Sequence, residues 1–119
     1  MQTTAMEESH GQSKFWKDRL VLITGLTGFI GCWLAERLLG EGALVVGYDL
    51  DDHHALDLHP GLRERIAFVR GDILDIKSLQ EAFAGHRINA CFHLAGQSMI
   101  ETGLASPMGT FEVNVRGTW

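Results

Sequence analysis

The sequence lacks the features that define several broad protein classes. Its formal net charge is −5, with 10 Lys and Arg against 15 Asp and Glu, so it has no excess positive charge to attract nucleic acid or an anionic membrane. No run approaches the roughly 18 apolar residues that a membrane-spanning helix needs. The N-terminus carries Glu7 and Glu8 and has no apolar signal-peptide core. These absences favour a cytoplasmic protein without nucleic-acid or membrane partners.

Cysteine is also scarce. Cys32 and Cys91 are isolated and show no metal-ligand spacing, so we expect reduced thiols packed as small, buried apolar side chains. His53, His54 and His59 lie close together in the sequence, but no cysteine or acidic constellation completes a metal site around them. We therefore expect a solvated histidine-bearing loop and no metal site.

What the sequence does have is an alternation of strand-like and helix-like segments. Short apolar runs typical of buried parallel strands occur at residues 20–24, 43–50, 65–72 and 88–96. In the helix-like segment after the first run, Ile30, Leu34 and Leu38 fall on one face. Asp75 is the expected N-cap of a later helix, and Ser106 with Pro107 is expected to begin the last one.

This alternation predicts the α/β class. We expect a Rossmann-type, doubly wound parallel sheet, of which the chain supplies the N-terminal half with strand order 3-2-1-4. The fourth strand is then at an edge of the sheet. Residues 1–18 are expected to be a mobile leader, with Phe15 and Trp16 the first large apolar side chains that pack, and residues 19–119 the N-terminal part of the domain.

Gly25, Gly28 and Gly31 form a G-x-x-G-x-x-G turn between the first strand and the first helix. A pyrophosphate fits at such a helix N-terminus because free backbone N–H groups and about half a unit of positive dipole charge meet it there. Gly25 permits a sharp turn, Gly28 keeps a Cβ away from the phosphate, and Gly31 lets helix and strand pack closely. The spacing alone also fits a plain turn with a packing glycine.

Acidic residues at two strand ends favour the dinucleotide interpretation. Asp49 ends the second strand roughly 20 residues after the glycines, where a carboxylate accepts hydrogen bonds from the adenosine ribose. Asp51 and Asp52 add negative charge and no cation for a 2′-phosphate, so the sequence favours NAD over NADP. Asp72 and Ile73 close the third strand, where they would reach the adenine amino group and cover the ring. A strand-end turn role remains the alternative for Asp49, and an N-cap role for Asp72.

The fourth strand ends in small residues, His93–Gln97, that would let a cofactor pass close to the backbone. Ligands of open parallel sheets lie beyond the carboxyl ends of the strands, where the strand order reverses. For His93 itself we expect a packed rather than a catalytic role.

Together these residues resemble the extended short-chain dehydrogenase/reductase superfamily, in its NAD-dependent epimerase/dehydratase group. "TGLTGFIG" (24–31) matches the T-G-x-x-G-x-x-G fingerprint, and "NVRGT" (114–118) is similar to N-V-x-G-T. "HLAG" (93–96) is similar to H-x-A-A, with Gly96 where alanine is usual. Within the group, "FWKDRLVLITG", "CWLAERLL", "VVGYDL" and "TFEVNVRGT" most resemble sugar-nucleotide 4,6-dehydratases, those acting on CDP-glucose in particular. Ile30 and Cys32 depart from the lysine and serine usual there.

The resemblance implies an NAD site built from all four strand ends and the last helix. It assigns the pyrophosphate to Gly25, Gly28, Phe29, Ile30 and Gly31, and the ribose to Asp49. It assigns the adenine to Asp72 and Ile73, the path toward nicotinamide to Leu94, Ala95 and Gln97, and a contact in the cofactor region to Asn114.

The resemblance also implies a reaction. Such enzymes oxidise C4 of a sugar nucleotide with NAD, eliminate water across C5 and C6, and return the hydride to C6, with a Y-x-x-x-K pair and a Ser or Thr moving protons. Here the only tyrosine, Tyr48, is followed four residues later by Asp52, so we expect Tyr48 to pack and no catalytic residue in the chain. We expect the catalytic and sugar-nucleotide segments beyond Trp119 and a homodimeric whole enzyme. A 4-epimerase of the same group and a non-catalytic NAD-binding module remain alternatives.

Overall fold

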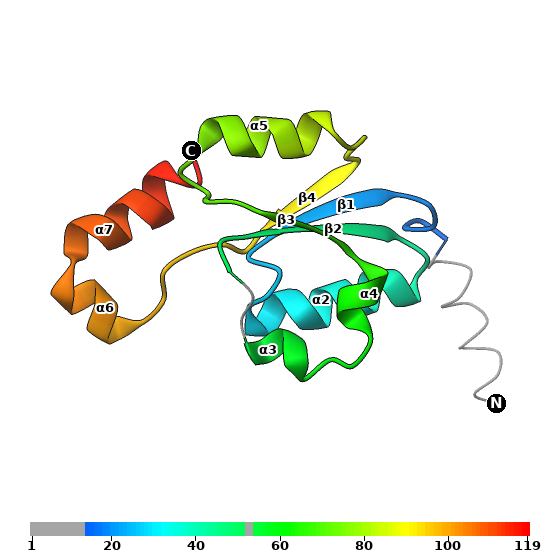
Figure 1. The fold of residues 1–119 in the computed structure, drawn as a ribbon, viewed down its shortest axis with the longest axis horizontal. Helices are drawn as coiled ribbons and strands as arrows, with labels where there is room; N and C mark the ends of the chain where they lie inside the picture. Colours follow the sequence, from blue (N-terminus) through cyan, green and yellow to red (C-terminus); the bar gives the residue numbers. More distant parts are fainter. Residues whose placement is uncertain (1–13, 52–53) are drawn as a thin grey trace.

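A single parallel sheet organises the chain. The computed structural model describes residues 14–51 and 54–119. Its four strands stand in the order β3-β2-β1-β4 (Figure 1). They are β1 (Leu20–Thr24), β2 (Leu44–Asp49), β3 (Ala67–Arg70) and β4 (Ala90–His93). The α/β class and the predicted order 3-2-1-4 are therefore confirmed.

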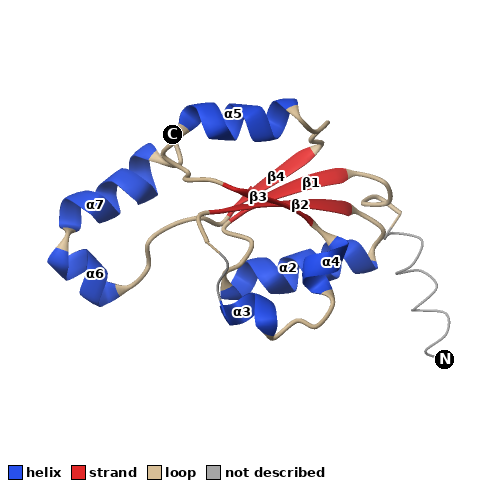
Figure 2. Cartoon of the chain, viewed as in Figure 1, coloured by secondary structure: helices blue, strands red, loops and turns tan. Residues whose placement is uncertain are grey.

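Helices cover both faces of this sheet. Figure 2 shows α2, α3 and α4 on one face, α5 on the other, and α6 and α7 to the side of the sheet. Their bounds are α2 (Phe29–Gly40), α3 (His54–Asp57), α4 (Leu62–Arg65), α5 (Ile76–Ala84), α6 (Ile100–Ala105) and α7 (Pro107–Phe111), followed by a π-helical segment (Glu112–Arg116). The predicted caps are confirmed, since Asp75 accepts from the Ser78 N–H and Ser106 accepts from the Gly109 N–H, both at 3.2 Å.

β1 lies at the centre of the sheet and explains why its sequence is continuously apolar. Leu22 stands opposite Val46 of β2 on one side and Cys91 of β4 on the other. Val21 and Ile23 point into the cluster under α2, whereas Leu22 packs with Val46 on the α5 face. Because both faces are covered, no residue of the strand interior meets water.

The buried face of α2 differs from the predicted one. Its buried residues are Gly31, Cys32, Ala35 and Leu38, while Ile30 is 68% exposed. The reason is the close approach of Gly31 to the turn before the helix, which rotates Ile30 out of the core. The predicted Ile30 position on the apolar face was therefore wrong, and the first turn of α2 is free to border a pocket.

The two cysteines have different environments. Cys32 is fully buried, as predicted, with its thiol 3.4 Å from the Leu26 carbonyl oxygen. Cys91 is exposed, so the prediction of burial was wrong for it. β4 pairs only with β1 among the described residues and forms the predicted edge, and the side chains on its Cys91 side, Cys91 and His93, are exposed. An edge strand with one open face cannot bury that side chain.

His59 does not belong to a solvated loop. It is only 7% exposed, its Nδ1 lies 3.3 Å from Glu36 Oε2, and the Trp33 ring packs edge-on at 4.7 Å between centroids. A hydrogen bond from Arg65 lowers the pKa of Glu36. The loop prediction was thus wrong for His59, because α4 brings Arg65 and the preceding chain back against α2. His53 lies outside the described residues, and residues 14–51 and 54–119 contain no group of three metal-ligand side chains.

The segment before β1 is tied to the sheet. Residues 1–13 of the expected leader lie outside the described range. Trp16 packs on Phe92 at 5.9 Å between ring centroids, and the Asp18 N–H donates to the Gly42 carbonyl at 2.9 Å. In the described part of the chain, no helix has the length and apolar character needed to cross a membrane.

The position of Leu22 gives a stability prediction. Leu22→Ala should lower the free energy of unfolding by about 2–5 kcal/mol, because a fully buried side chain leaves a cavity. Leu44→Ala, at a position 56% exposed in the neighbouring strand, should change it by about 0.5 kcal/mol or less. Urea titration followed by circular dichroism measures both. Equal midpoints for the two variants would contradict this core.

Candidate functional site

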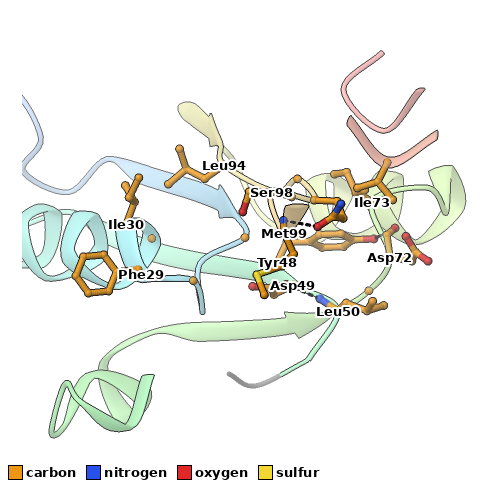
Figure 3. Close-up of a pocket in the computed structure, with 18 residues that line it drawn as sticks. Phe29, Ile30, Tyr48, Asp49, Leu50, Asp72, Ile73, Leu94, Ser98 and Met99 are labelled. Atoms are coloured by element: carbon orange, nitrogen blue, oxygen red, sulfur yellow. Dashed lines mark hydrogen bonds between the residues drawn. The ribbon is translucent and has the colours of Figure 1, made fainter. Parts of the chain in front are cut away.

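The carboxyl ends of all four strands border one pocket of about 590 Å³ (Figure 3). This volume lies in the usual range for small-molecule sites. The chain order of the strands reverses between β1 and β4, so the pocket occupies the switch point of the sheet. The loops after β1 and β4 touch there, since a Cβ built on Gly25 would lie 2.8 Å from the Ala95 backbone nitrogen.

The glycine turn has the geometry that the spacing predicts. Gly25 has φ +71°, a conformation that side-chain-bearing residues rarely adopt, and its N–H donates to the Tyr48 carbonyl at 2.8 Å. The Gly28 N–H donates back to the Gly25 carbonyl at 3.0 Å. A Cβ on Gly31 would lie 2.5 Å from the carbonyl oxygens of Gly25 and Leu26. The third glycine thus packs the helix against the turn itself rather than against the strand.

The N-terminus of α2 opens into the pocket without a cap. Gly28 is the N-cap residue, no side chain bonds to the first turn, and that turn contains no acidic residue. The first helical hydrogen bond runs from the Cys32 N–H to the Gly28 carbonyl, at 3.1 Å. The N–H groups of Phe29, Ile30 and Gly31 therefore have no acceptor within the helix. Their partial positive charge favours an anion at this wall of the pocket.

Asp49 stands at the end of β2 and is oriented by the glycine turn. Its Oδ2 accepts from the Thr27 N–H at 3.0 Å and from the Thr27 hydroxyl at 2.6 Å. Its Oδ1 accepts from the Leu50 N–H at 2.8 Å. Thr27 is fully buried, so this pair fixes the carboxylate against the turn. Sequence patterns did not reveal Thr27, because its role comes from a contact 22 residues away.

Asp72 and Ile73 follow β3 and lie over Tyr48. The Tyr48 hydroxyl donates to the Asp72 carbonyl at 2.8 Å, and the Asp72 carboxylate accepts from the Leu74 N–H at 2.9 Å. Burial raises the pKa of the Tyr48 phenol, and the nearby carboxylates of Asp75 and Asp72 add to that increase. The phenol is therefore a protonated donor at neutral pH. This buried, hydrogen-bonded tyrosine agrees with the packing role expected for it.

The loop after β4 is held by Asn114 of the π-helical segment. The Gln97 N–H donates to Asn114 Oδ1 at 2.6 Å, and Asn114 Nδ2 donates to the Gln97 carbonyl at 2.8 Å. Gln97 Nε2 also donates to the Thr110 hydroxyl at 2.9 Å. Asn114 does not border the pocket itself, so the structure shows it supporting the loop. Isolated π-helical turns of this kind are frequent at functional sites.

His93 links β4 to β1 and to the C-terminal segment. Its Nδ1 lies 2.7 Å from the Thr24 hydroxyl oxygen and its Nε2 lies 3.0 Å from that of Thr118. The Thr118 hydroxyl donates to the Asn114 carbonyl at 2.8 Å, so Nε2 is the ring nitrogen that carries the proton. The ring is solvent-exposed but held at both nitrogens.

Comparison with known proteins now identifies the family. A family model described as GDP-mannose 4,6 dehydratase matches residues 22–119. The chain belongs to this family. The resemblance to the NAD-dependent epimerase/dehydratase group is thereby confirmed. A CDP-glucose 4,6-dehydratase from Salmonella typhimurium is 35% identical over 106 residues, which cover 87% of this chain and 30% of that relative.

Epimerases of the group are equally similar. A UDP-glucose 4-epimerase from Neisseria meningitidis is 35% identical over 102 residues, covering 82% of this chain and 30% of the relative. The crystal structure of UDP-glucose 4-epimerase from Brucella ovis in complex with NAD matches with a TM-score of 0.70 and 32% identity, covering 84% of this chain and 30% of that one. The chain thus spans about 30% of the length of these relatives, which establish the family and not one reaction.

The structure brings most of the predicted site residues of this family member together. Eleven of the twelve border the pocket: Gly25, Gly28, Phe29, Ile30, Gly31, Asp49, Asp72, Ile73, Leu94, Ala95 and Gln97. Pocket residues that sequence reasoning missed are Tyr48, Leu50, Gly71, Gly96, Ser98, Met99 and Val113. All but Met99 are direct sequence neighbours of a predicted site residue, which is the signal that would have found them.

Sequence reasoning also missed one cation near Asp49. Arg70 ends β3 directly opposite Asp49 in the sheet register. Its guanidinium forms an ion pair with Asp51, at 3.2 Å between Nη1 and Oδ1. The absence of Lys and Arg among the residues that follow Asp49 therefore does not make this corner free of cations, although Arg70 is already paired.

Thr27 gives the prediction for this site. Thr27→Val should lower the free energy of unfolding by about 1.5–3 kcal/mol, because it removes a buried hydroxyl donor from a charged acceptor. Thr27→Ser keeps the hydroxyl and is the matched control, with a smaller loss. Guanidinium denaturation measures both variants. If valine and serine variants unfold at one midpoint, the Thr27–Asp49 hydrogen bond does not stabilise the turn.

Proposed function

We propose that this chain binds NAD in the pocket and forms the cofactor-binding part of a sugar-nucleotide 4,6-dehydratase, with CDP-glucose as the favoured substrate. The observation that carries the proposal is the uncapped N-terminus of α2, which faces the same pocket as the Asp49 and Asp72 carboxylates. A ligand with an anionic centre, and with hydroxyl and amino groups at one end, fits this arrangement. A dinucleotide has that chemistry.

The residues present fit NAD position by position. The free N–H groups at the start of α2 would hold the pyrophosphate, and Gly28 would let it approach the backbone. Asp49, oriented by Thr27, would accept hydrogen bonds from the adenosine ribose. Asp72 would accept from the adenine amino group, with Ile73 against the ring. The loop held by Asn114 would line the path toward the nicotinamide.

The charges around Asp49 favour NAD over NADP. A 2′-phosphate would stand beside the carboxylates of Asp49 and Asp51, and like charges about 4 Å apart repel by up to about 4 kcal/mol near a protein surface. Arg70 offsets part of this repulsion, but its guanidinium is already paired with Asp51.

The dehydratase assignment is supported by the family model and by the Salmonella typhimurium relative. Bound NAD would supply a hydride acceptor at the nicotinamide in a dehydratase or an epimerase alike. A second candidate is therefore a sugar-nucleotide 4-epimerase, which the Neisseria meningitidis and Brucella ovis proteins support. Because of the family resemblance, we expect the whole enzyme to be a homodimer that acts on a sugar nucleotide.

NAD binding can be tested at Gly28. Gly28→Val should weaken NAD binding at least tenfold, because its side chain would stand between the α2 N-terminus and the phosphate. The backbone of Gly28 is extended (φ −76°, ψ 176°), a conformation that valine adopts, and a Cβ there would lie 3.2 Å from the Gly25 carbonyl oxygen, which a shift of a few tenths of an ångström relieves. Gly40→Ala is the matched control, since a Cβ there meets nothing within 4 Å. Calorimetric titration of the chain with NAD gives the affinities, and wild-type affinity in Gly28→Val would refute the pyrophosphate position.

Turnover by the 119-residue chain is expected to be absent or weak. Its only tyrosine is buried with a raised pKa, and no lysine follows it four residues later. Incubation with CDP-glucose and NAD, followed by chromatographic detection of a 4-keto-6-deoxy sugar nucleotide, tests this. Product formation above the protein-free blank would show that the chain itself contains proton-transfer groups that we have not identified.

A further inference from the structure

The phenol of Tyr48 lies directly beneath the segment proposed to hold adenine. Tyr48 is the last but one residue of β2, its side chain points to the α5 face of the sheet, and it is 1% exposed. Figure 3 shows its ring reaching toward Asp72 under the pocket. Its hydroxyl donates to the Asp72 carbonyl at 2.8 Å.

Tyr48 also lies close to the residues on either side of Asp72. A Cβ on Gly71 would collide with the phenol oxygen and lie 2.6 Å from the phenol carbon that carries it. Ile73 packs against the apolar cluster that contains Tyr48. Every residue of the segment 71–73 therefore contacts Tyr48 or its cluster.

Ser78 of α5 anchors the phenol from the other side. Its hydroxyl oxygen lies 3.1 Å from the Tyr48 hydroxyl. Gly71 is close to the Ser78 hydroxyl as well, since a Cβ built on Gly71 would lie 2.6 Å from Ser78 Oγ. The phenol thus joins β2, the segment after β3 and the first turns of α5 through one polar atom.

We propose that Tyr48 is a positioning residue that fixes Asp72 and thereby selects adenine over other purines. The inference rests on the proposed NAD site. The Asp72 carboxylate accepts hydrogen bonds, so it pairs with the 6-amino group of adenine and repels the 6-oxo group of hypoxanthine. This discrimination requires a fixed carboxylate. The phenol of Tyr48 holds the Asp72 backbone at its carbonyl, and the Leu74 N–H holds the Asp72 carboxylate.

The test compares two dinucleotides that differ only at this base. NAD and nicotinamide hypoxanthine dinucleotide are titrated calorimetrically into the unmutated chain and into Tyr48→Phe. Phenylalanine keeps the ring packed among Leu22, Val46 and Ala82 and removes only the hydroxyl. We expect the ratio of the two affinities to fall on the order of fivefold in Tyr48→Phe, the effect of about one hydrogen bond.

Two further variants keep the result interpretable. Ser78→Ala leaves the phenol in place without its second hydrogen-bond partner, and it should lower the ratio of the two dinucleotide affinities by a smaller factor. This variant replaces Tyr48→Phe in the test if Tyr48→Phe does not melt cooperatively. Leu44→Ala, at the other end of β2, should keep the wild-type ratio. A variant that binds both dinucleotides more weakly at an unchanged ratio would reduce Tyr48 to a structural role and overturn the inference. Failure of the unmutated chain to bind either dinucleotide would refute the proposed function instead.

Discussion

The arrangement depends on one close backbone approach, that of the turn after β1 to the loop after β4. Gly25 adopts a left-handed conformation, donates to the last carbonyl but one of β2, and leaves no room for a Cβ beside Ala95. The turn therefore leaves β1 at an angle that starts α2 at the pocket rather than under the sheet. Any side chain at Gly25 would separate the two loops, so the pocket and the direction of the helix follow from a single residue type.

The pocket gains its chemical character from groups of opposite charge that border it. The start of α2 supplies N–H groups and partial positive charge with no acidic residue to neutralise them. Asp49 and Asp72 supply carboxylates, each oriented by hydrogen bonds from its own surroundings, Thr27 for one and Leu74 for the other. Because these groups are held before any ligand arrives, binding would not have to order them. Such preorganisation lowers the entropic cost of binding a ligand that meets all of these groups.

The features that the sequence predicts correctly are those that depend on local sequence patterns. The apolar runs, the caps at Asp75 and Ser106 and the glycine turn each depend on neighbouring residues, so strand order and pocket location followed. The features it did not reveal depend on register between distant segments. Arg70 meets Asp49 only because β3 pairs with β2, and His59 is buried only because α4 returns to α2. Cys91 is exposed because the face of β4 on its side has no cover. Local apolar patterns do not reveal whether another element will cover a given face of a strand.

Tyr48 shows why residue type alone does not assign a role. A tyrosine that transfers protons at neutral pH needs a pKa lowered toward 7 and access to the substrate. Burial has the opposite effect on Tyr48, and its hydroxyl is directed away from solvent to the Asp72 carbonyl. The same properties make it an effective fixed donor, since a phenol that stays protonated keeps its hydrogen bond across the physiological pH range. The tyrosine in this chain is therefore suited to hold a binding segment in place, and its chemistry is that of support rather than of proton transfer.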